Sequence, residues 1–324
     1  MKQVKALDPG TYTRHRIHGE DRSWAETNCY VDVLVELLHG LEYEPVAALP
    51  FTLAIDYEGD QWTFFKFPHE DLYALFGVEI QEFNPWRSLV EHVDKQIEMG
   101  RPVLVEMDSY FLPDTRGTAY QNHHEKSTIA VNAIDIERQY LGYFHGASYY
   151  ELEGEDFANI FQVHGLVHER MLPPYIEYVK QRHLGAKLSE SQLLECSEDL
   201  LRKHLGLIPG TNPFLAFKTA FAQDFEWLVN ETIDTFHQYS FATLRQYGAC
   251  FELVETYLQW LQAHGHRNLE PAIEAFATIS NTAKTFQFQL ARAMARKRAI
   301  DLASIDTMAD CWQRGMQLLT DKYR

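Results

Sequence analysis

The sequence predicts an α+β first half followed by an all-α second half. In the first half, short apolar runs rich in β-branched residues alternate with segments of helical periodicity. Beyond about residue 165, nearly every segment repeats its apolar residues at helical spacing. At 324 residues the chain is long enough for two such domains. We therefore expect an α+β domain at residues 1–165 and an all-α helical domain at residues 166–324.

The first long helix is predicted to begin near Cys29. Residues 23–26 (SWAE) have the S-x-x-E spacing of a capping box, and Asn28 is a further candidate N-cap. Apolar residues then recur at helical spacing as far as Gly40, where we expect the helix to end.

The remaining elements follow from the same patterns. Residues 58–60 (EGD) form a turn signal between two apolar runs, which predicts a hairpin, and Gly100 is expected to stop a helix. The expected first-half elements are hairpin strands at 52–57 and 61–67, helices at about 69–76 and 86–99, and strands at 102–107, 128–134 and 140–144. The expected second-half helices span 189–205, 212–236, 240–264, 268–298 and 301–322.

The composition disfavours several classes of partner. The net charge of -17 opposes binding to nucleic acid and to anionic membranes, because both are polyanions. No apolar run approaches the ~18 residues needed to cross a bilayer, and residues 1–12 lack the apolar stretch of a signal peptide. We therefore expect a cytoplasmic protein that binds neither nucleic acid nor membrane. The sequence leaves the oligomeric state open.

The cysteines give no sign of a metal centre or a disulfide framework. Cys29, Cys196, Cys250 and Cys311 are far apart and form no CxxC pair, which fits a reducing compartment.

Two further patterns bear on cofactors. His164 and His168 are one helical turn apart but lack the glutamate of an HExxH site, so we interpret them as polar residues at a helix end. No glycine-rich phosphate loop is present. We expect neither a metal nor a cofactor.

Cys29 is the candidate nucleophile. It follows a polar cap and opens a helix, where free amide donors and a partial positive charge favour thiolate over thiol. A cysteine at this position can attack a carbonyl, and the same amides can hold the resulting oxyanion. A small buried structural residue is the alternative interpretation of Cys29.

Three segments occur in an order known from one family. Residues 27–30 (TNCY) open an apolar helix, residues 100–113 read GRPVLVEMDSYFLP, and histidines precede the strand at 128–134. Over roughly residues 20–160, this order resembles the N-terminal domain of the butirosin-type aminoacyl side-chain transferases, a branch of the papain-like cysteine peptidase superfamily. The chain also resembles a bacterial domain-of-unknown-function family, whose members we expect to be its closer kin. The resemblance implies a papain-like fold for the first half.

The resemblance also implies a Cys–His pair with a third residue that orients the histidine. The position expected for the histidine falls on Ser127, whereas His123 and His124 come four and three residues earlier. We favour His124 as the general base and acid for Cys29. The alternatives are His123, or loss of the base.

The orienting residue and the oxyanion donor also depart from the papain-like pattern. Asn132, Asp108 and His145 are the three candidates for orienting the base. Papain-like peptidases carry an oxyanion-hole glutamine six residues before the cysteine, but Ser23 stands there. Asn28, together with the backbone amide of the nucleophile, is the better candidate donor.

Members of the resembled family move an aminoacyl group from the phosphopantetheine arm of a carrier protein onto an amine, through a thioester on the cysteine. The resemblance therefore implies a thiol-dependent acyl or aminoacyl transferase whose partner is an acyl or aminoacyl carrier protein. Two alternatives stay open: a cysteine hydrolase of a peptide, amide or thioester, and a catalytically inactive papain-like binding or scaffold protein. An imidazole within hydrogen-bond reach of the Cys29 sulfur would favour an enzyme, and Ser127 in that place would favour the scaffold.

One segment departs from the acidic character of the chain. Residues 284–298 contain no acid, and a carrier protein, generally acidic around its modified serine, needs a local positive surface on which to dock. The candidate carrier-binding residues are Lys284, Arg292, Arg296, Lys297 and Arg298. A basic helix C-terminus is the alternative interpretation, because the helix dipole favours it without any partner.

Overall fold

The computed structural model describes residues 1–165, 174–182 and 187–324. The chain forms two compact units. The boundary expected between residues 165 and 166 falls at the start of the first undescribed stretch. Two stretches of the first half group with the helical unit rather than with the sheet. The first unit comprises residues 1–19, 28–45 and 72–187, and the second comprises residues 20–27, 46–71 and 188–324.

The first unit is built on an antiparallel sheet, which within the described residues has seven strands. The strands are β1 (Lys2–Gln3), β2 (Val78–Glu82), β3 (Val103–Asp108), β4 (Lys126–Asp135), β5 (Tyr140–His145), β6 (Ser148–Glu153) and β7 (Ile176–Gln181). Their order is β2-β7-β3-β4-β5-β6, and β1 pairs with the end of β4. The strands predicted at 102–107, 128–134 and 140–144 are β3, β4 and β5, so those predictions are confirmed.

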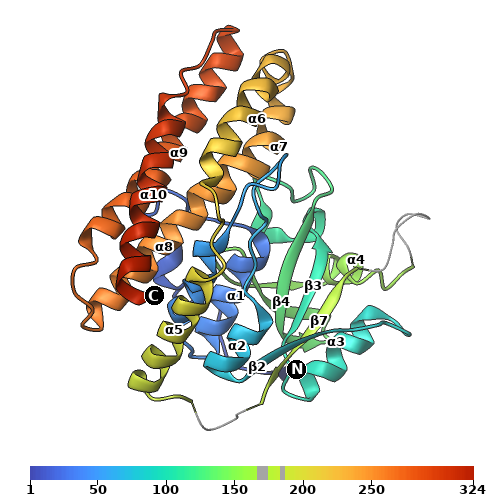
Figure 1. Ribbon diagram of the computed structural model, residues 1–324. Coiled ribbons are helices and arrows are strands. Elements are labelled where there is room, and N and C mark those ends of the chain that lie inside the picture. Colours follow the sequence, from blue (N-terminus) through green and yellow to red (C-terminus); the bar gives the residue numbers. More distant parts are fainter. Residues whose placement is uncertain (166–173, 183–186) are drawn as a thin grey trace. The chain divides into compact units, whose positions relative to one another are not determined.

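Helices cover both faces of this sheet (Figure 1). The helices of the first half are α1 (Cys29–Gly40), α2 (His69–Phe76), α3 (Leu89–Glu98) and α4 (Glu155–Ile160). On one face, α3 and α4 enclose a core that includes Val105 of β3 and Val131 of β4. On the other face, α1 packs so closely on β5 that a Cβ on Gly40 would lie 2.5 Å from the Phe144 ring. The prediction of an α+β first half is confirmed.

The predicted hairpin at 52–67 is wrong. Residues 45–54 form a 3-10 helix, and only an isolated bridge joins Tyr57 to Trp62. The predicted turn is present, because Glu58 N–H donates to the carbonyl of Gln61 and Gly59 has φ +100°. The apolar run is buried by tertiary packing in the second unit, which the local alternation could not reveal.

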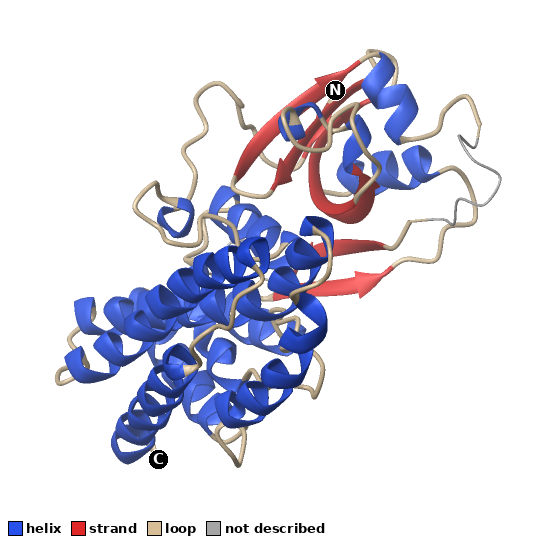
Figure 2. Cartoon of the chain, turned by 90° about the horizontal axis from the view of Figure 1, so that it is seen from above, coloured by secondary structure: helices blue, strands red, loops and turns tan. Residues whose placement is uncertain are grey.

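The second unit is helical, and its long helices run side by side (Figure 2). The predicted helices at 189–205, 268–298 and 301–322 are confirmed, whereas the other two are divided differently. Thr232 caps a new helix by accepting a hydrogen bond from Thr235 N–H, and a π-helical turn at 241–245 then leads on without a break. The helices are α5 (Glu190–Leu205), α6 (Pro213–Leu228), α7 (Ile233–Ser240), α8 (Gln246–Ala263), α9 (Glu270–Arg296) and α10 (Ala303–Tyr323). Among the described residues, no helix combines the length and the apolar character that crossing a membrane requires.

Candidate functional site

Cys29 is the first residue of α1, as the sequence predicted. Asn28 is the N-cap: its carboxamide oxygen accepts a hydrogen bond from Val31 N–H at 3.0 Å. That oxygen is therefore used to hold the helix end. The Cys29 sulfur is partly exposed and lies 3.6 Å from the Thr128 hydroxyl, on the central strand β4. Within the described part of the chain, no hydrogen bond joins this sulfur to an imidazole.

The register of β3 and β4 places a second group of candidates on the same face of the sheet as Cys29. Thr128 is opposite Glu106, and Asp108 is opposite Lys126. Because side chains alternate along a strand, Asp108 and Thr128 are on the same face of the sheet. Asp108 lies two residues, about 7 Å, further along β3 than Glu106, which is the residue opposite Thr128.

His124 is bonded to Asp108. Its Nδ1 lies 2.6 Å from the Asp108 carboxylate, and its ring stacks on Tyr110 with centroids 4.4 Å apart. The side chain is 63% exposed, and Nε2 has no hydrogen-bond partner among the described residues. The predicted base and one predicted orienting residue are thus brought together. His123, by contrast, points to Glu125 and Asn122.

Asn132 and His145, the other two candidates for orienting the base, are engaged elsewhere. Asn132 lies at a bulge in β4, where its side chain accepts from Lys5 N–H and donates to the Lys5 carbonyl and to the Tyr149 hydroxyl. This fully buried amide therefore fastens the N-terminal strand to the sheet. His145 is paired with Ile129 across β4 and β5, so its side chain is on the same face of the sheet as Ile129. Thr128, which contacts Cys29, is on the opposite face.

His145 belongs to a hydrogen-bonded relay that the sequence analysis missed. The Ser127 hydroxyl lies 2.6 Å from His145 Nε2, and His145 Nδ1 lies 2.5 Å from the Asp114 carboxylate. Tyr143 donates to the other Asp114 oxygen. Burial, together with the Asp114 charge, raises the pKa of the Tyr143 hydroxyl, which therefore stays a donor. The order Ser Oγ, His Nε2, His Nδ1, Asp is that of a serine-hydrolase triad.

The relay could have been found from one sequence signal only, the Leu112-Pro113-Asp114 segment that ends in an acid. Asp114 is 31 residues from His145 in the chain, so no local spacing links them. The pairing of β4 with β5 brings Ser127 and His145 together. Asp114, in a 3-10 turn at 113–115, lies within hydrogen-bond distance of His145.

A buried charge cluster lies along α1, about one and two helical turns beyond Cys29. His18 bonds Glu36 through Nδ1 at 2.5 Å and Asp32 through Nε2 at 3.3 Å. Tyr12 donates to the same Glu36 carboxylate. Burial opposes the charged imidazole, but hydrogen bonds and charges from Asp32 and Glu36 outweigh it and raise the pKa of His18 to about 9. The cluster ties the N-terminal segment to α1 with a charged histidine at neutral pH.

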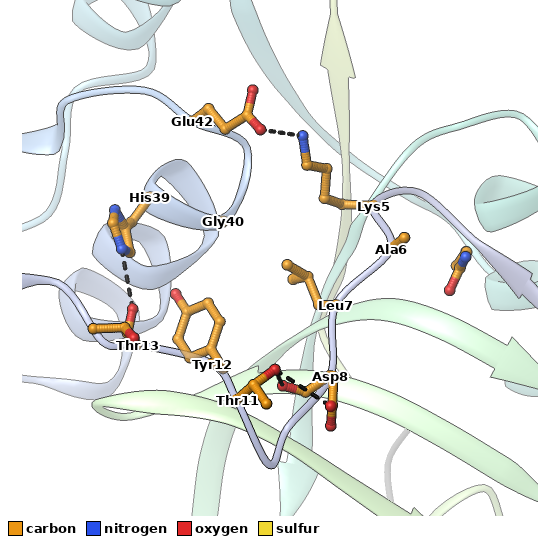
Figure 3. A pocket seen from close by; sticks show the side chains of 11 residues that line it. Lys5, Ala6, Leu7, Asp8, Thr11, Tyr12, Thr13, His39, Gly40 and Glu42 are labelled. Carbon is orange, nitrogen blue, oxygen red and sulfur yellow. Dashed lines mark hydrogen bonds and ion pairs between the residues drawn. The ribbon is translucent and has the colours of Figure 1, made fainter.

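One hollow of the first unit lies at the other end of α1 (Figure 3). It has a volume of about 650 Å³ and is bordered by the Lys5–Glu42 ion pair and by His39, which bonds the Thr13 carbonyl. Since the 12 residues of α1 span about 18 Å, this hollow is separate from Cys29. It brings together none of the residues predicted for the site.

The predicted carrier-binding residues separate into two groups within the second unit. Lys284 lies over the Trp24 ring, 4.3 Å from its centre, and burial with the nearby Arg245 lowers the pKa of its ammonium group. Arg292, Arg296 and Arg298 line a pocket at the end of α9. Lys297 is the exposed C-cap of that helix, with φ +48°.

Within the described residues, no group of three or more His, Cys, Asp or Glu side chains is arranged to hold a metal ion. His168, one member of the histidine pair noted in the sequence, lies outside the described residues.

Two family models match the chain. The one described as the DUF1839 N-terminal domain matches residues 13–181, and the one described as the DUF1839 C-terminal domain matches residues 190–321. No curated protein matches. Together the two models cover both halves of the chain, in agreement with the kinship expected from the sequence.

Proposed function

The chain belongs to the DUF1839 family over both of its halves, and we propose that its first unit is a papain-like, cysteine-dependent acyl or aminoacyl transferase. Cys29 is the nucleophile, His124 the general base and acid, and Asp108 the residue that orients His124. The proposal takes its chemistry from the position of Cys29 at a helix N-terminus.

The observation that carries the proposal is the His124–Asp108 pair on the Cys29 face of the sheet. A carboxylate on Nδ1 fixes the imidazole tautomer and leaves Nε2 able to take a proton. In the present structure Thr128, not an imidazole, contacts the sulfur. The reaction therefore requires the exposed His124 ring to move toward Thr128 when substrate binds, as catalytic hydrogen bonds often tighten only in the complex.

The reaction follows from these roles. Cys29 gives its proton to His124 and attacks the thioester carbonyl of the donor. The donor thiol leaves with that proton, and the acyl group remains on Cys29 as a new thioester. An acceptor amine then attacks, its proton passes through His124 to the Cys29 sulfur, and the amide product leaves. Free amides at the start of α1, rather than the Asn28 carboxamide oxygen, are suited to hold the oxyanion.

The proposed donor is an acyl or aminoacyl group on the phosphopantetheine arm of a carrier protein, and the proposed location of the reaction is the cytoplasm. Arg292, Arg296, Lys297 and Arg298 are exposed and can attract an acidic carrier. Lys284 is a weaker candidate because its ammonium group is packed on Trp24. With water in place of the amine, the same machinery would make a cysteine hydrolase.

A model thioester tests the proposal directly. We suggest incubation with an aminoacyl N-acetylcysteamine thioester, which imitates the end of the phosphopantetheine arm, followed by intact-mass measurement and peptide mapping. The wild type should gain one acyl group on Cys29. His124→Ala should lower the rate of acylation by about 100-fold or more, while His123→Ala, its neighbour in the same loop, should acylate normally. Equal rates in His124→Ala and the wild type would remove His124 from the mechanism.

The Ser127–His145–Asp114 relay supports a second candidate, a serine hydrolase. Its carrying observation is the unbroken chain of short hydrogen bonds from the hydroxyl to the carboxylate. A fluorophosphonate probe, which labels activated serines, should then modify Ser127, and both Ser127→Ala and His145→Ala should remove the label. Labelling elsewhere, or none, would make the relay a structural support for the 109–126 loop.

The third possibility is a protein that has kept the fold without the chemistry. It is supported by the Thr128 hydroxyl at the place where an imidazole would contact the Cys29 sulfur. Absence of both the Cys29 thioester and the Ser127 label, with the wild-type fold intact by circular dichroism, would exclude both chemistries, as this third possibility expects.

A further inference from the structure

A pocket of the second unit lies between the end of α9 and the start of α10. Its volume is about 310 Å³, and three of its lining residues are Arg292, Arg296 and Arg298. Small ligand sites begin at about this size. The pocket concentrates positive charge in a chain whose net charge is -17.

None of the three guanidinium groups has a hydrogen-bond or ion-pair partner among the described residues. Other arginines of the same unit do have partners: Arg202, for example, is paired with Glu198 and Asp199. Arg292 and Arg296 are four residues apart on one helix, where like charges repel. The pocket therefore holds three guanidinium groups that form no ion pair or hydrogen bond within the described chain.

The helix dipole explains only part of this arrangement. Arg296 is the last residue of α9, where the dipole favours a cation, and the effect fades beyond the last turn. Arg298 lies past the helix end and is held near it, because Lys297 adopts a left-handed conformation and Arg298 N–H donates to the carbonyl of Ala293. The turn after α9 therefore places Arg298 in the same pocket as Arg292 and Arg296.

The other polar groups of the pocket define the charge of its ligand. Asp301 is the one acidic residue among those lining it, and its Oδ1 accepts from Ala303 N–H at the start of α10. Gln289 and Ser304 add a carboxamide and a hydroxyl, both able to donate. Three guanidinium groups and one carboxylate leave a balance of two positive charges.

We propose that this pocket binds a phosphate monoester. A phosphate monoester carries close to two negative charges at neutral pH and three acceptor oxygens, which match the charge balance and the donors of the pocket. Arginine forms paired hydrogen bonds to phosphate oxygens, so three guanidinium groups can enclose one phosphate. The site is on the helical unit and does not depend on the reaction proposed for Cys29.

Calorimetric titration of the full chain with phenyl phosphate, in chloride buffer at constant ionic strength, tests the proposal. Binding should be one to one, and Arg292→Gln with Arg296→Gln should weaken it by about tenfold or more. The matched control, Arg267→Gln with Arg314→Gln, removes two charges from exposed positions of the same unit outside the pocket and should leave the affinity within about twofold. Arg298→Gln, beyond the end of α9, should also weaken binding.

Two other ligands separate phosphate monoesters from other anions. Diethyl phosphate, a diester with one charge, should bind at least about tenfold more weakly than phenyl phosphate, and acetate should not compete at equal concentration. The proposal is overturned by any of three results: no binding of phenyl phosphate, equal binding in the Arg292/Arg296 variant and the wild type, or a diester or acetate that binds as well as the monoester.

Discussion

Cys29 and Ser127 lie on opposite faces of the same sheet, Cys29 against Thr128 of β4 and Ser127 at the neighbouring position of that strand. Cys29 lies on the face that carries Thr128. Ser127 lies on the other face, with Ile129 and the apolar core. Each has an imidazole–carboxylate pair on its own face: His124 with Asp108, and His145 with Asp114. A single substitution therefore affects one pair without touching the other.

We expect Cys29 to be the most reactive of the four thiols. Burial raises the pKa of the thiols of Cys196, Cys250 and Cys311, which keeps them protonated at neutral pH. Cys29 is partly exposed and is the first residue of α1, so a reagent can reach it at a helix N-terminus. Brief alkylation with iodoacetamide at pH 7, followed by peptide mapping, should label Cys29 first. Earlier labelling of Cys196, the other partly exposed thiol, would contradict this expectation.

Asp108→Asn should impair acylation of Cys29 while the protein stays folded. The amide cannot stabilise an imidazolium at His124 and offers Nδ1 the wrong hydrogen bond, so the rate should fall by about 100-fold or more. The measurement is the rate of thioester formation with the model substrate. Asp114→Asn is the matched control, because it changes the Ser127 relay only. A loss in Asp114→Asn as large as that in Asp108→Asn would contradict the role given to Asp108.

At the scale of elements, α1 connects the candidate nucleophile to the sheet. It is buried along almost its whole length, and its last residue, Gly40, lies against Phe144. The helix position therefore depends on the absence of a side chain at residue 40.

Gly40→Ala should destabilise the protein by about 1 to 3 kcal/mol, because the new methyl group overlaps the Phe144 ring. Urea unfolding followed by fluorescence measures the change. Gly210→Ala, where nothing lies within 4 Å of the added Cβ, should leave the stability within about 0.5 kcal/mol of the wild type. Full stability of Gly40→Ala would mean that α1 shifts freely on the sheet.

The local elements were largely predictable from the sequence, whereas their partners were not. Periodicity and caps located α1, α3, α5, α9 and α10, because those signals act within a few residues. The hairpin predicted at 52–67 was wrong because the apolar residues of this segment pack on helices distant in the sequence. Trp62, for instance, contacts Phe214 and Tyr247. The Ser127 relay was missed for the same reason, since its members meet only through strand pairing.

At the scale of the whole molecule, the His18 cluster makes stability depend on pH. The pKa of His18 is about 9 in the folded protein and about 6.5 when unfolded, so its stabilisation is complete below pH 6.5 and is lost as the pH rises through 9. Urea unfolding at pH 7 and at pH 9.5 should differ by on the order of 2 kcal/mol from this group. His18→Gln should be less stable at pH 7 and should show a smaller difference. An unchanged pH dependence would exclude His18 as its cause.

The composition of the helical unit predicts how fragments behave. Residues 46–71 belong to that unit, and Ser197, His204 and Cys250 bond to Ala47, Asp71 and Thr52. A fragment of residues 188–324 lacks these contacts and should show helical circular dichroism without a cooperative thermal transition. Addition of a peptide of residues 46–71 should restore the transition. Cooperative melting of the fragment alone would contradict this view.

The place of β7 in the sheet has a consequence for the order in which the protein is made. Of the strands in the described residues, β7 comes last along the chain, yet it lies between β2 and β3. A ribosome adds roughly 5 to 20 residues per second, so several seconds separate the synthesis of β3 from that of β7. During that time the facing edges of β2 and β3 have no partner, and unpaired edges invite association with other chains. A nascent chain that pauses before residue 176 should therefore be the form most dependent on chaperones.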